Sequence, residues 1–278
     1  MGGTMLRVTY IAIMFATLFV FGLSFADAID AGGTPNSFAH TFVLFLHQLL
    51  LVYWIGPDIA VFVWSRLAVN PQLGPEQRVT AGRMMTVIDL VPRVCLALFL
   101  TVAGILSETY GITHPWWQMV GIVLLGPVWL FIVLGAWLKQ GSEFGRTLAT
   151  FDIWVRVALV IGIPASVAYS TMTGRLEDTP WITGKLMILA AVILLGLLMR
   201  LRLQGFFDGV DRLAADGPSP ETDRQMATSQ KRSRPFVYAI WLLLLWAALL
   251  GVVKPGDTSL PAAASNFADA PAQLARGK

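Results

Sequence analysis

The chain contains seven apolar runs, and each is long enough, or nearly so, to cross a lipid bilayer. They lie at 6–24, 39–65, 84–107, 116–138, 151–172, 181–203 and 236–253. About 20 helical residues span the ~30 Å hydrocarbon layer, where every backbone polar group needs a partner within the protein. We therefore predict an all-α fold, a polytopic transmembrane helical bundle of about seven spans, with the lipid bilayer as its partner.

Composition agrees with this fold class. Hydrophobic residues make up 56% of the chain and charged residues 13%, whereas roughly 25% of the residues in a soluble domain are charged. The single cysteine, Cys95, lies within a run and permits neither an intrachain disulfide nor a thiolate metal cluster. The chain has no nucleotide-binding motif and no hydrolytic triad, and we expect no nucleic-acid partner.

The first run has two interpretations. Arg7, the apolar stretch and Ala26-Asp27-Ala28 resemble a secretory signal peptide with its cleavage site, but a retained first span is preferred. Cleavage of 1–28 would leave six spans. The chain is accordingly divided into three parts: the N-terminal span and an outer loop (1–38), the bundle (39–253), and a flexible outer tail (254–278).

Lysine and arginine gather in the loops of one side. With the N-terminus in the cytoplasm, 13 of them flank the spans on the cytoplasmic side and 4 on the outer side. The positive-inside rule then predicts the N-terminus inside and the C-terminus outside, in a bacterial inner (cytoplasmic) membrane. The polar segment 206–235 contains Gly217-Pro218-Ser219-Pro220 and is predicted to be a flexible cytoplasmic connector with short helical turns.

A helix pair is repeated within the bundle, at 84–141 and 151–205. A shift of 63 residues places Asp89 over Asp152 and Arg93 over Arg156. Charged residues are rare in membrane spans, so the paired Asp-x-x-x-Arg favours a duplication. The alternative is two helices that acquired an i,i+4 ion pair independently. At a shift of 64 residues Gly121 lies over Lys185, so only the second copy places a lysine inside the membrane.

The span Ala39–Arg66 carries polar groups on one narrow stripe. At 100° per residue, His40, His47, Trp54 and Asp58 fall within ~40° of one another. Helical rise separates this stripe into two polar layers. We interpret the inner layer as a structural ion-pair network, with a proton or quinone path as the alternative. Its members are Asp58, Asp89, Arg93, Asp152 and Arg156. The outer layer contains His40, His47, His114 and Lys185.

His47 is the candidate ligand of a metal or a haem, because a histidine three turns into a span must face the bundle. His40, at the interface, and His114 are further candidate metal ligands. A second axial ligand of a haem iron would come from another helix, as His114 or Lys185. Lys185 could instead hold a haem propionate or extend to the interface. Trp54 is deep enough to wall a cofactor pocket. Copper is the alternative metal.

Two short motifs resemble a known superfamily. Leu46-His47 followed by Trp54-Ile55-Gly56 resembles the first-helix motif of CopD-like copper-resistance proteins, which HemJ-type protoporphyrinogen oxidases share. Trp181-Ile182-Thr183-Gly184-Lys185-Leu186 resembles a HemJ-type Trp-x-x-x-Lys-Leu motif. The resemblance implies haem b linked to His47 and a key functional role, here catalytic, for Lys185. The chain is longer than HemJ-type proteins, and Ser233-Arg234-Pro235 replaces their Asn-Glu-Pro stretch.

The leading hypothesis is an integral membrane b-type haem protein. It would take part in electron transfer, or in oxidation of a lipid-phase donor such as a quinol or a porphyrinogen, near the outer face. In the second case it would be an oxidoreductase; whether it is an enzyme stays open. One alternative is a CopD-like copper uptake permease. Another is a non-catalytic membrane subunit of a larger respiratory or metalloenzyme complex.

Overall fold

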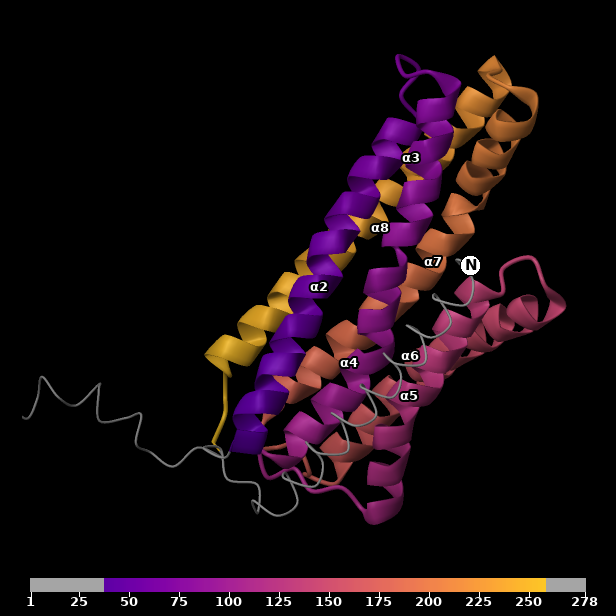
Figure 1. Ribbon diagram of the computed structural model, residues 1–278. Coiled ribbons are helices and arrows are strands. Elements are labelled where there is room, and N and C mark those ends of the chain that lie inside the picture. The colour runs from indigo at the N-terminus through magenta and orange to yellow at the C-terminus, as the bar shows by residue number, and fades with distance from the viewer. Residues whose placement is uncertain (1–37, 259–278) are drawn as a thin grey trace, which may run out of the picture.

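The computed structural model describes residues 38–258, and all the secondary structure within them is helical (Figure 1). The predicted first span, the possible signal peptide and nearly all of the predicted outer tail lie outside the described residues. The helices are α2 (Phe38–Ala68), α3 (Pro75–Ile88), α4 (Leu90–Glu108), α5 (Trp116–Leu138), α6 (Glu143–Met172), α7 (Pro180–Asp216) and α8 (Pro220–Val253).

Six helical stretches are long and apolar enough to cross a membrane, with α3 and α4 forming one stretch. They coincide with the six runs predicted between 39 and 253, so that part of the prediction is confirmed. The chain is therefore a multi-pass α-helical membrane protein by class. We call the end of the bundle that carries His40 and His114 the histidine end, and the end that carries Arg78 and Arg212 the arginine end.

Proline and a buried threonine shape the helices near the site. Pro92 has no N–H to offer the carbonyl of Ile88, and the chain is interrupted there, between α3 and α4. The Thr101 hydroxyl of α4 bonds twice to the backbone of α5. It donates to the carbonyl of Ile122 (2.6 Å) and accepts from the Gly126 N–H (2.8 Å). A Cβ on Gly126 would lie 2.8 Å from Thr101 Oγ1, so glycine is needed for this close crossing of α4 and α5.

The helices follow one another around the bundle, with α4 against α5, α5 against α6, and α6 against α7. At the arginine end α7 and α8 continue as a long antiparallel pair beside α2 and α3 (Figure 1). The 37 residues of α7 measure about 55 Å at 1.5 Å per residue, well beyond the hydrocarbon thickness. The bundle thus has a helical extension on one side only.

This extension differs from the flexible connector predicted over 206–235. Only a short turn at Gly217 to Ser219 separates α7 from α8, and the Ser219 hydroxyl caps α8 by accepting from the Thr222 N–H. The segment is polar on average, but its apolar residues face α3. The residues of this contact are Ala81, Met85, Phe206, Val210, Leu213 and Met226. Average polarity concealed an apolar face, which is why the prediction missed the helices.

The inner polar layer is centred on Asp152 of α6. Its carboxylate is 4% exposed, pairs with Arg156 (3.0 Å) and Arg200 of α7 (2.9 Å), and accepts from Trp129 Nε1 of α5 (2.8 Å). One side chain therefore joins three helices. The repeat-related Asp89 forms its ion pair with Arg93 alone and is more exposed.

Asp58 was predicted to join this ion-pair layer, but none of the ion pairs found among the described residues includes it. Its carboxylate accepts a hydrogen bond from Trp241 Nε1 of α8 (2.6 Å). Rotational position on α2 alone did not show which helix Asp58 would meet.

We predict that Asp152→Asn destabilises the protein much more than its repeat counterpart Asp89→Asn. Removing the Asp152 charge leaves two arginines without a partner, one of them buried. A loss of about 3 kcal/mol from a broken buried pair corresponds to a fall of roughly 5–10 °C in the unfolding midpoint. Cys95, 3% exposed, reports unfolding when a thiol-reactive dye gains access to it. Equal midpoints for the two variants would contradict the central role of Asp152.

Candidate functional site

A cavity of about 530 Å³ lies at the histidine end, lined by six helices and the loops that join them. We call it the His47 cavity. Its walls are mainly apolar, and small residues such as Ala103 of α4 and Gly162 of α6 keep it open. Side chains that carry or can gain a positive charge are few: His47 and Lys185 lie in its interior, and His114 and Arg175 are contributed from near the helix ends.

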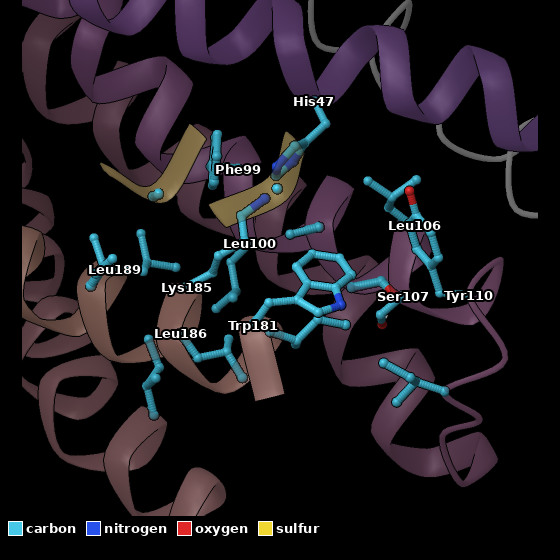
Figure 2. A pocket seen from close by; sticks show the side chains of 18 of the residues that line it. His47, Phe99, Leu100, Leu106, Ser107, Tyr110, Trp181, Lys185, Leu186 and Leu189 are labelled. Atoms are coloured by element: carbon cyan, nitrogen blue, oxygen red, sulfur yellow. The ribbon is translucent and has the colours of Figure 1, made fainter. Parts of the chain in front are cut away.

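His47 is held by packing rather than by a hydrogen bond. It is 9% exposed, its ring lies 4.4 Å from that of Phe99, and its Nδ1 has no hydrogen-bond partner among the described residues. A buried polar atom without a partner costs free energy, so such atoms point to an unmet ligand. Figure 2 shows the imidazole beside Phe99, with the Lys185 side chain extending from α7 toward it.

Gly251 of α8 leaves room for the Lys185 side chain, which extends toward His47. A Cβ on Gly251 would lie 2.7 Å from Lys185 Nζ, so any larger residue would displace the ammonium group. Nζ also lies 5.5 Å from the centre of the Trp181 ring. Among residues 38–258, the ion pairs of the structure do not include Lys185, and the charge acting on it is another cation, Lys254. An apolar cavity with one ammonium group favours an anionic or electron-rich ligand.

His114 lines the same cavity, but its polar contacts are with its own loop. Its Nδ1 lies 2.7 Å from Glu108 Oε1, and its backbone N–H donates to the same oxygen at 2.8 Å. Burial lowers the pKa of His114 below its ordinary value, although the hydrogen bond to Glu108 acts in the opposite direction. Glu108 engages Nδ1, so Nε2 is the ring nitrogen of His114 that a metal ion would use.

His40 and Trp54, both predicted site residues, do not line the cavity. His40 Nδ1 lies 2.7 Å from the Thr109 hydroxyl, and its ring packs edge-on against Tyr110. Trp54 is in the core and packs edge-on behind Phe99. No group of three or more His, Cys, Asp or Glu side chains that could hold a metal ion occurs within 38–258. The predicted histidines therefore do not form one cluster.

The sequence did not predict the cluster of Tyr110, Trp181 and Lys254 at the histidine end of the cavity. Lys254 Nζ donates to the Tyr110 hydroxyl (3.2 Å) and lies 4.4 Å from the centre of that ring. Tyr110 packs edge-on against Trp181, whose Nε1 donates to Asp257 (3.1 Å). Lys254 could have been noticed as one of the few cations predicted on the outer side. Phe99 and Gly251 gave no comparable signal.

Comparisons with protein-family models, curated proteins and solved structures found no match for this chain. The resemblance to CopD-like and HemJ-type proteins consequently rests on the two short motifs around His47 and Lys185. What the structure adds is that both motifs contribute to the same cavity.

We predict that Lys185→Met stabilises the fold. Desolvating an ammonium group without a carboxylate partner costs free energy, and methionine fills similar volume without that cost. A gain of about 1 kcal/mol would raise the unfolding midpoint by roughly 2–4 °C. Lys254→Met is the matched control and should not stabilise, because Lys254 bonds to Tyr110. A lower midpoint for Lys185→Met than for wild type would show that Lys185 serves the fold instead.

Proposed function

We propose that this chain is a membrane-embedded b-type haem protein that oxidises a lipid-phase donor, with His47 as the iron ligand. The observation that carries the proposal is the buried Nδ1 of His47, which has no partner among the described residues and belongs to a side chain that lines a large cavity. The resemblance of the His47 and Lys185 motifs to haem-linked membrane proteins supports the same assignment.

The residues present fit a haem with one protein ligand. The cavity volume of about 530 Å³ is within the range of about 300–1,000 Å³ usual for cofactor pockets. His47 supplies a neutral imidazole, and Lys185 supplies a cation that would hold a propionate. When bound, the haem would supply one-electron redox chemistry at its iron. His40 does not line the cavity, and His114 is bonded to Glu108 through Nδ1, so a second histidine ligand could come only from Nε2 of His114.

Ligation by His47 alone would favour reaction with a substrate over electron relay. His47 would orient the cofactor, Phe99 and the apolar walls would exclude water, and Lys185 would hold a propionate. Arg175 donates to the Thr113 carbonyl (2.7 Å), which holds the loop next to the cavity in place.

We also infer the finer topology from the lysine and arginine distribution. It supports a cytoplasmic N-terminus, a seventh span at 6–24, and a bacterial inner membrane in which the histidine end faces outward. Alkaline phosphatase fused after Lys278 should then be active, and the same enzyme fused within the α7–α8 turn at Gly217 should be inactive. The opposite pattern would reverse the orientation and place the cavity toward the cytoplasm.

The absorption spectrum of the purified protein tests the haem assignment. We expect a Soret band in the wild type, or after haem supplementation, and its loss in His47→Ala. His40→Ala is the matched control on the same helix and should keep the band, because His40 does not line the cavity. An unchanged spectrum in His47→Ala would sink the ligand assignment. Absence of the band, with stoichiometric copper in the wild type, would favour the copper permease instead.

A further inference from the structure

The helices α2 and α8 are joined at two levels, with the His47 cavity between them. At the arginine end Asp58 bonds to Trp241, and Phe62 packs edge-on against Trp241 with ring centres 5.6 Å apart. At the histidine end the contacts described above connect α2 to the end of α8, from His40 through Tyr110 to Lys254. Between these levels, both helices contribute residues to the cavity wall.

The cavity wall on this side consists of small and uncharged residues. On α8 it is formed by Leu244, Ala247, Ala248, Gly251 and Val252, and on α2 by Leu44, His47, Gln48 and Leu51. Only His47 and Gln48 in this set are polar. The ammonium group of Lys185 lies against this wall from α7, since a Cβ on Gly251 would be 2.7 Å from its Nζ. The wall residues of α2 and α8 themselves carry no fixed charge.

Gln48 is the unusual residue of this wall. It lines the cavity and is exposed, although it lies in the middle of an apolar span, about 15 Å along α2 from Phe38 at 1.5 Å per residue. An amide at this depth costs free energy unless it bonds to something polar. Gln48 lies next to His47 but off the stripe that His47 shares with Trp54, so that stripe did not indicate it as a candidate site residue.

We propose that the cavity opens to the bilayer between α2 and α8, and that a quinol with an isoprenoid chain enters there. Its ring oxygens would meet the Gln48 amide at the edge of the cavity, while its chain remains in lipid beside Ala247 and Ala248. A neutral ring with a long apolar chain suits a wall whose α2 and α8 residues carry no fixed charge. A quinol is thus the class of donor. The proposal rests on the proposed function only in taking the haem as the acceptor of the quinol's electrons.

Photolabelling of the full chain in lipid nanodiscs tests this binding directly. The probe is a ubiquinone analogue with a diazirine in a short isoprenoid chain, and the labelled peptides are read by mass spectrometry. We expect labels concentrated at 44–51 of α2 and 244–252 of α8, displaced by unlabelled ubiquinone-2 but not by added phospholipid. Labels spread evenly over the lipid-facing helices, or displaced equally by phospholipid, would overturn the proposal.

Two substitutions on α8 provide a matched pair. Ala248→Trp fills the gap between α2 and α8 and should reduce the displaceable labelling about tenfold. Leu249→Trp places the same ring on an exposed neighbour outside the cavity and should leave labelling unchanged. Gln48→Leu, which keeps the side-chain size, should also weaken labelling, and it serves if Ala248→Trp does not fold. Wild-type labelling in both Ala248→Trp and Gln48→Leu would contradict the entrance.

The two proposals fail separately. A protein that binds the quinone probe but has no Soret band loses the haem assignment and keeps this site. A protein with a His47-dependent Soret band and no displaceable labelling keeps the haem assignment and loses this entrance.

Discussion

The structure depends on the absence of water from the bilayer interior, where a polar group must find its partner within the protein. Asp152 meets this constraint most fully, because two arginines and the Trp129 indole satisfy one carboxylate and tie α5, α6 and α7 together. Thr101 does the same for α4 and α5 through two backbone groups. Two buried side-chain atoms lack a hydrogen-bond partner among the described residues, Arg156 Nη2 in this junction and His47 Nδ1, and of these two residues only His47 lines the cavity. A buried polar group of this kind in a cavity marks a candidate functional site.

The cavity follows from how these contacts are distributed. On the arginine-end side of the cavity, polar contacts join α5, α6 and α7, and aromatic contacts join α2 to α8. Toward the histidine end some facing positions are small, as at Ala103 and Gly162, and packing does not fill the space beside them. The ring of Phe99 separates this space from the core around Trp54. The helices are thus held together by ion pairs around Asp152, whereas small residues leave a cavity toward the histidine end.

The sequence predicted the six described spans because bilayer thickness fixes the length of an apolar run, whatever the helix packs against. It also predicted that His47 and Lys185 share a level, since helical rise gives depth. It could not give neighbours. His40, His47, Trp54 and Asp58 occupy one stripe of α2, yet they meet Thr109, a cavity, the core and Trp241. A stripe about 27 Å long passes several helices, and rotation about α2 does not say which.

The repeated helix pair shows why chemistry would be confined to one side of the bundle. Its two Asp-x-x-x-Arg pairs both form, but Asp152 is buried in a three-helix junction whereas Asp89 is at the break before α4. At the position where the copies differ, Gly121 of α5 is exposed with open space around it, and Lys185 of α7 extends into the cavity. A second lysine at 121 would therefore add a cation outside the cavity. Both copies contribute to the cavity wall, the first with Phe99 against His47, but only the second carries an ammonium group that extends toward His47.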